Sequence, residues 1–217
     1  MKRSKRTQAI LKNFAGINQS IIIKPGNKLQ TISNVKDVFA KADIEEQFET
    51  QVAIYDLNEF LGVLSLFEDP DLEFTDRSVK ITQGKATQTY YYADASIITS
   101  PPEKGITLPS TEVTGKMTRE QLQSLIKASG LNDATSLTFK NGSARVWNSS
   151  VANSNVFEIS DVMDHNADYE LSIAVEKLKM VSDDYDIQIC AKGLSHFTGT
   201  QGIEYFVALM PNGKYGA

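Results

Sequence analysis

The sequence predicts an α+β protein of two similar domains, each with two helices packed on antiparallel sheets. Three observations support this prediction. Amphipathic helical segments alternate with short strands of period two along the 217 residues. A segment with adjacent prolines and a glycine, Ser100 to Gly105, interrupts this pattern near the midpoint. The order of elements then repeats after the interruption. We therefore expect domains at 1–98 and 111–217, joined by a connector at 99–110.

The first predicted helix covers residues 4–17 and has two unlike faces. Ile10 and Phe14 recur at i and i+4, a spacing that places apolar side chains on one helical face. Lys5 and Lys12 fall about 180° from Phe14 on a helical wheel. This helix is expected to present one face to a core and an opposite, cationic face to solvent.

The rest of the first domain is predicted as strands around a second helix. Strands at 20–24 and 28–33 should form a hairpin, and Asp56 should cap a helix that runs to about residue 67. The far side of that helix carries Glu59 and no cation. Strand alternation predicts a buried Tyr91 between two surface tyrosines. Further strands are expected at 38–44, 51–55, 72–75, 78–83 and 85–93.

The second domain repeats this plan. Thr118 should cap a helix at 119–129 that ends at Gly130, with Ile126 on its apolar face. The pair Asn141-Gly142 predicts a type I′ turn, and therefore a hairpin. The remaining elements are expected as a short helical turn at 175–180 and strands at 112–116, 136–139, 144–147, 155–160, 169–174, 185–191 and 205–210.

Charge is segregated along the chain, although the net charge is only −5. Residues 1–36 hold eight of the 22 basic residues and none of the 27 acidic ones. Such segregation indicates a polyanionic partner for one surface and an acidic exterior elsewhere. Lysine and arginine on one face bind phosphates without reading bases, so we expect sequence-independent nucleic-acid binding.

No combination of residues predicts a catalytic, metal or cofactor site. His165 and His196 lie in segments predicted as exposed loops, without a second ligand at metal-binding spacing. The single cysteine, Cys190, falls in a predicted strand and is expected in the core, and one cysteine cannot form an intrachain disulfide. Glycine-rich phosphate loops and nucleophile elbows are missing from the sequence. No apolar run reaches the roughly 20 residues that span a bilayer.

Several stretches resemble the sliding clamps of T-even-like bacteriophages, which are processivity factors of DNA polymerases. The matching segments occur from end to end in the same order, and they are ILKNFA at 10–15, VAIYDLN at 52–58, AKG at 191–193 and VAL at 207–209. The resemblance implies the DNA-clamp fold and a closed head-to-tail homotrimer, with sheets outside and helices around a central hole. Duplex DNA would pass through this ring while the ring tethers the replicative polymerase.

The resemblance also implies roles for particular residues. The DNA-facing candidates are Lys5, Lys12, Lys2, Arg6, Lys127, Lys177 and Lys179. Candidates for a hydrophobic pocket that receives polymerase tails are Ile106, Leu108, Pro109, Leu209, Met210 and Pro211. Candidates for strand pairing between subunits are Thr87, Thr89, Tyr90, Tyr91, Tyr92, Val156, Phe157 and Ile159.

Implied partners are double-stranded DNA, the polymerase, an ATP-driven clamp loader, late-transcription factors and two further copies of the chain. The expected location is the cytoplasm of an infected bacterial host, without a signal peptide or a membrane segment. Two alternatives remain from the residues alone. One is a structural or capsid-associated β-rich phage protein with a basic N-terminus, and the other is a small hydrolase.

Overall fold

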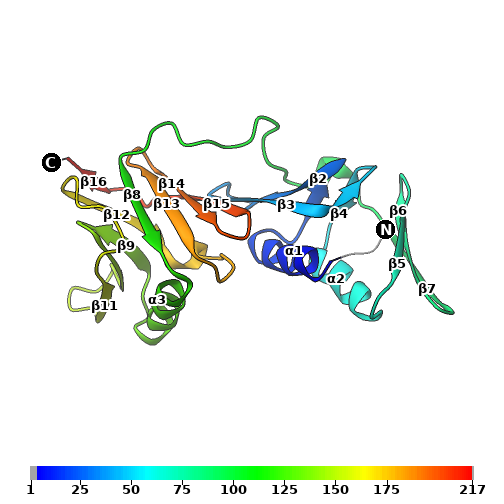
Figure 1. Ribbon diagram of the computed structural model, residues 1–217, viewed down its shortest axis with the longest axis horizontal. Helices are drawn as coiled ribbons and strands as arrows, with labels where there is room; N and C mark the ends of the chain where they lie inside the picture. The colour runs from blue at the N-terminus through cyan, green and yellow to red at the C-terminus, as the bar shows by residue number, and fades with distance from the viewer. Residues whose placement is uncertain (1–3, 217) are drawn as a thin grey trace. The chain divides into compact units, whose positions relative to one another are not determined.

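The computed structural model describes residues 4–216, and the chain divides into two compact units, Met1–Gly105 and Ile106–Ala217 (Figure 1). The boundary between the units falls inside the segment predicted as a connector. Each unit is α+β, with helices packed beside antiparallel strands, so the predicted fold class is confirmed.

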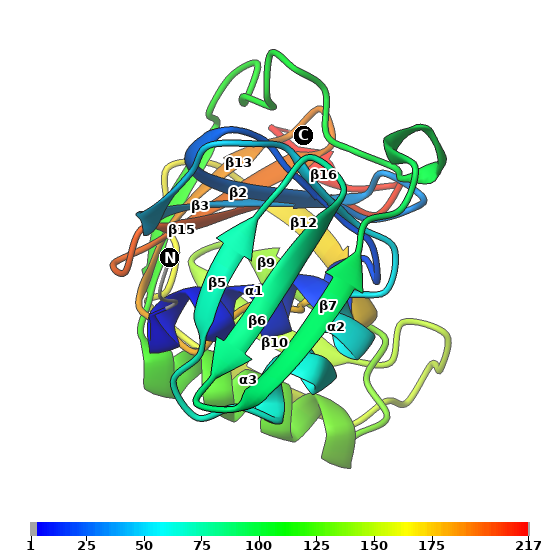
Figure 2. The same ribbon diagram turned by 90° about the vertical axis from the view of Figure 1, so that its right-hand side faces the viewer.

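The described part of the first unit consists of seven strands, two α-helices and one 3₁₀ turn. They are α1 (Lys5–Ile17), β1 (Ile21–Ile23), β2 (Gly26–Ile32), β3 (Val38–Phe48), β4 (Val52–Ile54), α2 (Leu57–Ser65), β5 (Asp71–Phe74), β6 (Ser78–Gln83), β7 (Ala86–Tyr91) and η1 (Ala95–Ile97). Strand β1 pairs with β4, β2 pairs with β3, and β5, β6 and β7 form a meander (Figure 2). Helix α1 packs against α2 and β3.

Strands β1 and β2 do not form the predicted hairpin. The two strands follow one another, but β1 hydrogen-bonds to β4 in the register Ile21↔Ile54. The reason lies in the link between them, because Pro25 has no backbone N–H to donate and Gly26 has a φ of 121°. These two residues redirect the chain, so that β2 pairs with β3 instead.

The prediction for the tyrosines of β7 is also wrong. Tyr91 is 75% exposed, whereas Tyr90 and Tyr92 on either side are half-buried. The aromatic ring of Tyr90 meets that of Phe60 in α2 edge to face, with centroids 5.1 Å apart. Across these three tyrosines the exposed and covered positions are the reverse of the prediction, and the rest of β7 is exposed without alternation.

The described part of the second unit consists of nine strands, one α-helix and one 3₁₀ turn. They are β8 (Val113–Met117), α3 (Arg119–Leu131), β9 (Ser136–Lys140), β10 (Ser143–Trp147), β11 (Val156–Ile159), β12 (Tyr169–Ala174), η2 (Val175–Lys177), β13 (Tyr185–Cys190), β14 (Leu194–Gly199), β15 (Ile203–Ala208) and β16 (Lys214–Tyr215). One sheet has the order β11-β10-β9-β12-β16, and in the other β15, β14, β13 and β8 are neighbours.

Helix α3 begins as predicted and ends later than predicted. Thr118 forms a capping box with Gln121, which satisfies two backbone N–H groups at the helix start. The helix continues through Gly130 to Leu131, because nothing in the fold forces a left-handed residue at Gly130. Ile126 is 41% exposed and does not belong to the apolar face, which Leu122 and Leu125 form with smaller buried residues.

The sequence did not predict two strands of the second unit, and it placed one histidine in the wrong kind of element. Strand β14 buries alternate positions, but these are Ser195, Phe197 and Gly199, so its inward row shows little apolar signal in the sequence. Strand β16 has only two residues. His196 lies in β14 rather than in an exposed loop. Its ring stacks on Phe206 at 4.0 Å, and its Nε2 lies 2.8 Å from Glu204 Oε2. Cys190 is buried, as expected.

Strand β8 lies at a sheet edge that the chain itself covers. The Lys116 N–H donates to the Val162 carbonyl and the Asp164 N–H donates to the Thr114 carbonyl, each at 2.8 Å. Gly115 permits this close approach, because a Cβ there would overlap Met163 and the Val162 carbonyl. The edge of β8 is thus closed to other strands.

The two units share most of their order of elements. In the first unit α1, four strands, α2 and three strands follow one another. In the second unit β8 comes before α3, and four strands, η2 and four strands follow that helix. The predicted internal repeat is therefore present. Its second unit departs from the prediction of two helices, because the place of α2 is taken by the three-residue 3₁₀ turn η2.

Candidate nucleic-acid interface

The solvent-exposed face of α1 carries cations and small residues only. Lys5, Ala9, Lys12 and Gly16 are exposed and recur at helical spacing, while the opposite face is buried. The two lysines lie two turns apart, about 10 Å along the axis. Neither makes an ion pair with any residue from 4 to 216. An uncompensated positive face of this kind attracts phosphates.

The first turn of α1 is fastened to β3. The Ser4 side chain caps the helix by accepting from the Thr7 N–H. The carboxylate of Glu46 accepts hydrogen bonds from the Ser4 backbone N–H and from Thr7 Oγ1, the latter at 2.5 Å. Arg6 Nη1 donates to the Asp43 carbonyl at 2.7 Å. Arg6 is therefore directed toward β3 and away from the Lys5 face.

Glu46 is the residue of this region that the sequence prediction missed. Burial opposes its ionisation, but the hydrogen bonds from Thr7 and Ser4 outweigh burial, and the pKa of the carboxyl lies below its ordinary value. A signal was present, because Glu46 occupies an inward position of β3 between the buried Ile44 and Phe48. A charged side chain among buried apolar residues is unfavourable unless a specific partner compensates for its lost hydration.

The other predicted cations lie on less uniform surfaces. Lys127 is exposed on α3, whose exposed face also carries Glu120. Lys177 is half-buried in η2 and Lys179 is exposed beyond it. Lys2 lies outside the described residues. Helix α2 exposes Asn58, Glu59 and Gly62, so the cationic face belongs to α1 rather than to the helices in general.

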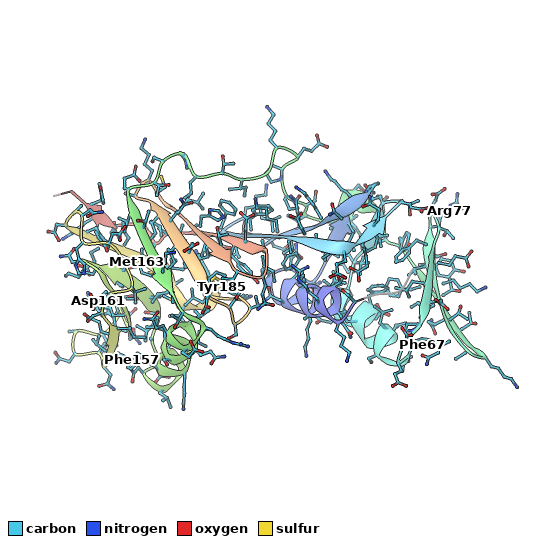
Figure 3. All side chains as sticks on the ribbon, in the orientation of Figure 1. Phe67, Arg77, Phe157, Asp161, Met163 and Tyr185 are labelled. Atoms are coloured by element: carbon cyan, nitrogen blue, oxygen red, sulfur yellow. The ribbon has the colours of Figure 1, made fainter. Side chains whose placement is uncertain are left out.

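Strands β7 and β11 are sheet edges with unusual exposure. Five of the six residues of β7 and three of the four residues of β11 are exposed, so neither strand has a well-buried face. The exposed apolar side chains include Tyr91, Val156 (51% exposed) and Phe157 (37% exposed). Phe157 lies in the part of the second unit that contains α3 (Figure 3). Open edges with apolar side chains favour pairing with another chain.

The residues predicted for a tail pocket are only partly covered. Ile106, Leu108, Leu209 and Met210 are half-buried, and Pro109 and Pro211 are exposed. The backbone there is well held, because the Leu209 N–H donates to the Gly193 carbonyl and the Met210 N–H to the Ser172 carbonyl. All six residues belong to the second unit, three of them before β8 and three after β15.

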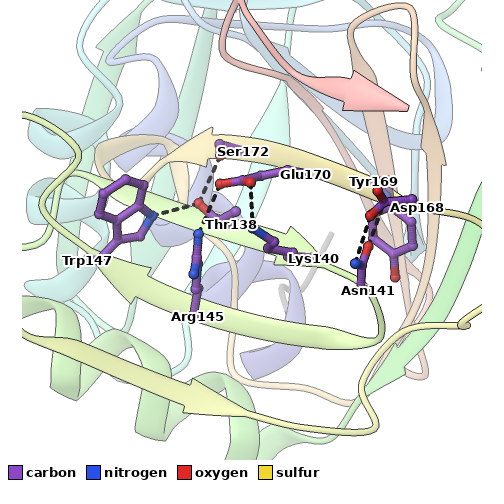
Figure 4. Close-up of polar contacts among 9 residues, drawn as sticks. All are labelled: Thr138, Lys140, Asn141, Arg145, Trp147, Asp168, Tyr169, Glu170 and Ser172. Atoms are coloured by element: carbon purple, nitrogen blue, oxygen red, sulfur yellow. Dashed lines mark hydrogen bonds and ion pairs between the residues drawn. The ribbon is translucent and has the colours of Figure 1, made fainter. Parts of the chain in front are cut away.

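A hydrogen-bonded network covers the polar face of the β9-β10-β12 sheet (Figure 4). Glu170 accepts from Lys140 and Arg145 at 2.8 and 2.9 Å, and these contacts, the Lys140 hydrogen bond first, hold the pKa of its carboxyl below the usual range. Arg145 also lies 5.2 Å from the ring of Trp147, whose Nε1 donates to Thr138 Oγ1. Two cations share the one carboxylate of Glu170, and the buried Nε of Arg145 has no hydrogen-bond partner among the described residues. The contacts join β9, β10 and β12, so they support the sheet.

Two cavities of the described chain are lined mainly by polar and charged residues or by a turn. One, of about 630 Å³, lies beside β8 and is lined by Lys116, Asp186 and the Asp161 to Asp164 segment. Another of about 310 Å³ lies next to Pro25 and Lys28. Residues 4–216 contain no group of three His, Cys, Asp or Glu side chains placed to hold a metal ion. None of the helices in that range has the length and apolar character of a membrane span.

Comparison with known proteins gives matches over both units. A family of DNA polymerase processivity factors matches residues 2–100, and the C-terminal family of the gp45 sliding clamp matches residues 115–211. A sliding clamp of Vibrio phage KVP40 is 36% identical over 220 residues, which cover 96% of this chain and 98% of the relative. The sliding clamp of Enterobacteria phage T4 is 33% identical over 222 residues, 96% of each chain.

Solved structures give the same fold at lower identity. A PCNA2-PCNA3 complex from Sulfolobus tokodaii superposes with a TM-score of 0.70 at 18% identity, over 94% of this chain and 95% of that one. The A. fulgidus PCNA bound to a C-terminal region of FEN-1 also gives 0.70, at 14% identity, over 95% of this chain and 96% of that one. The predicted resemblance is confirmed: this chain belongs to the sliding clamp family of DNA polymerase processivity factors.

Proposed function

We propose that three copies of this chain close head to tail around duplex DNA and slide along it while tethering the replicative polymerase. The observation that carries the DNA contact is the α1 face, where Lys5 and Lys12 stand without an acidic neighbour on the helix. Phosphate contacts from such a face are independent of sequence and weaken with salt, as sliding requires. The ring itself, rather than tight binding, retains the DNA.

Subunit closure is assigned to β7 of one chain and β11 of the next. Both are open edges, and both carry exposed apolar side chains, which strand pairing would cover. Because the two edges belong to different units, this contact is heterologous and closes only if the rotation between subunits completes a ring. Three subunits are proposed from the family resemblance.

The proposed protein partners are the polymerase, an ATP-driven clamp loader and late-transcription factors. The half-buried apolar side chains of Ile106, Leu108, Leu209 and Met210 are assigned to a polymerase tail. We infer that the chain binds and tethers without catalysis, which agrees with the description of its family as processivity factors. The alternative of a capsid-associated protein is not favoured, because both halves of the chain match clamps.

A processivity assay tests the function as a whole. The cognate polymerase and loader should make longer products on a primed template when this chain is added, measured on a denaturing gel with excess trap DNA. Products of equal length with and without the chain would contradict the tethering role.

Charge reversal on α1 tests the DNA contact. The variant with both Lys5→Glu and Lys12→Glu should bind a short duplex more weakly, with a smaller dependence on salt, because it makes fewer phosphate contacts. Both side chains are exposed, so the melting temperature should stay close to that of the wild type. Fluorescence anisotropy at several salt concentrations measures binding. Wild-type affinity in a folded double variant would remove the α1 face from the DNA interface.

A further inference from the structure

Glu46 is a charged side chain at a core position. It faces inward from β3, in line with Ile44 and Phe48, and only 8% of its surface is exposed. Removing a carboxylate from water is unfavourable unless hydrogen bonds compensate for the lost hydration. The hydrogen bonds that compensate for this lost hydration therefore indicate the role of Glu46.

Both carboxylate oxygens of Glu46 receive hydrogen bonds from the first turn of α1. Oε1 accepts from the Ser4 backbone N–H, and Oε2 accepts from Thr7 Oγ1 at 2.5 Å. The first four N–H groups of a helix have no partners within the helix, and the positive end of the helix dipole favours a nearby anion. Glu46 supplies that anion from a neighbouring strand.

A second contact from β3 holds the same turn. Arg6 Nη1 donates to the Asp43 carbonyl at 2.7 Å, three residues before Glu46 on the strand. Lys5 lies between Ser4 and Arg6, so both of its chain neighbours are fixed to β3. Lys12 lies two turns further on, where the buried Phe14 and Ile10 hold the helix.

We propose that Glu46 is a positioning residue for DNA: it fixes the first turn of α1 on β3 and thereby directs Lys5 toward the phosphates, while Lys12 is positioned without it. This inference rests on the proposed function, because it requires that Lys5 contacts DNA. It predicts energetic coupling of Glu46 with Lys5 and none with Lys12.

A double-mutant cycle on the full chain tests the coupling. Binding to a short linear duplex is measured by fluorescence anisotropy over a range of salt for Glu46→Gln, Lys5→Ala and Lys12→Ala, and for Glu46→Gln combined with each lysine variant. Glu46→Gln and Lys5→Ala should each reduce the slope of log affinity against log salt by about 1 for each phosphate contact that the substitution removes. Combining these two should reduce it no further, whereas combining Glu46→Gln with Lys12→Ala should give the sum of the two reductions.

Asp183→Asn provides the matched control. Asp183 is the other buried acid of the described chain, 4% exposed, and it accepts hydrogen bonds from Thr200 Oγ1 at 2.6 Å and from the Gln201 N–H at 2.9 Å. Its substitution should lower the melting temperature as that of Glu46 does, without changing the salt slope. This comparison separates positioning from general destabilisation.

Thr7→Val is a second variant for the case in which Glu46→Gln does not fold. Valine keeps the shape of threonine and removes the hydroxyl that donates to Glu46, so it should show the same lack of additivity with Lys5→Ala. Full additivity with Lys5→Ala, or an unchanged slope in both Glu46→Gln and Thr7→Val, would overturn the positioning role. If Lys12→Ala alone changes the slope, the inference is wrong and the DNA-facing role of α1 stands. If neither lysine changes it, that role is wrong as well.

Discussion

Each unit has one buried carboxylate that holds nearby backbone in place. Glu46 binds the start of α1, and Asp183 binds the turn after β14. For both residues burial opposes ionisation, and hydrogen bonds from a threonine hydroxyl and from backbone N–H groups outweigh it. Both pKa values consequently lie below the ordinary range. Each acid is therefore charged at neutral pH, and the ionised form contributes to the stability of the folded chain.

Stability should depend on the charge of Glu46. Its pKa is lower in the folded chain than its ordinary value of 4.5, so its contribution is fully present above that value and is lost as pH falls through the folded pKa. The melting temperature of wild type should decrease below about pH 4.5, and that of Glu46→Gln should start lower and decrease less steeply. Calorimetry between about pH 3 and pH 7 measures both curves.

A residual acid dependence is expected in Glu46→Gln, because Asp183 and Glu170 also have lowered pKa values. Two parallel curves for wild type and variant would show that the hydrogen bonds to Glu46 do not depend on its charge.

For single residues, the sequence predicts which face of a helix a side chain occupies better than it predicts the hydrogen-bond partner of that side chain. The wheel of α1 correctly separated Phe14 from Lys5, because helical periodicity is a local property. The role of Glu46 depends on a hydrogen bond to Thr7, which lies 39 residues away along the chain, and no local pattern contains that contact. Tyr91 was misplaced because β7 has no well-buried face to set the phase of its alternation.

Among the elements, those with a local cause were predicted best. The hairpin of β9 and β10 follows from Asn141-Gly142, whose φ values of 42° and 91° suit a type I′ turn. The predicted hairpin of β1 and β2 failed at Pro25, because ladder formation depends on donors that proline lacks. Pairing of β1 with β4 is a long-range choice that strand patterns do not encode.

Glycine substitutions in α3 and β8 should have opposite effects. Gly130 lies inside α3, where a Cβ would have no neighbouring atom within 4 Å, so Gly130→Ala should stabilise the chain by up to about 1 kcal/mol. Gly115→Ala should destabilise it by about 1–3 kcal/mol, because the added methyl group would overlap Met163 and the Val162 carbonyl. Urea denaturation measures both changes. Equal stability of the two variants would contradict this account of β8.

For the molecule as a whole, the segregated charge and the two open edges, β7 and β11, are the features on which the proposed ring depends. The cations of residues 1–36 include the exposed face of α1, and the acids occur after residue 36. The two-unit plan and the family were predictable, because they depend on repeated patterns and on matching segments. The sequence indicated the edge strands only through the order of strands along the chain. It could not show that both faces of β7 and β11 are exposed, because this exposure depends on how the chain folds.

Ring closure should be sensitive to charge at these edges. Phe157→Asp in β11 and Tyr91→Asp in β7 each place a charge where the proposed contact is apolar, so each should shift the chain from trimer toward monomer. Sedimentation velocity over a range of concentrations measures the shift. Tyr55→Asp is the control, because Tyr55 is 52% exposed and lies outside both edges. A trimer of unchanged stability in both edge variants would contradict the assigned contact.

The segment that hydrogen-bonds to the edge of β8 has a consequence for aggregation of the chain before it assembles. It consists of Val162 to Asp164, and it begins three residues after β11 ends at Ile159. A lone subunit therefore presents one unpaired edge directly beside another that only a short loop closes. In the proposed ring β11 would be paired with β7 of the next chain, so only unassembled chains would expose this edge to aggregation. Aggregation would then follow the amount of unassembled chain rather than the total amount made.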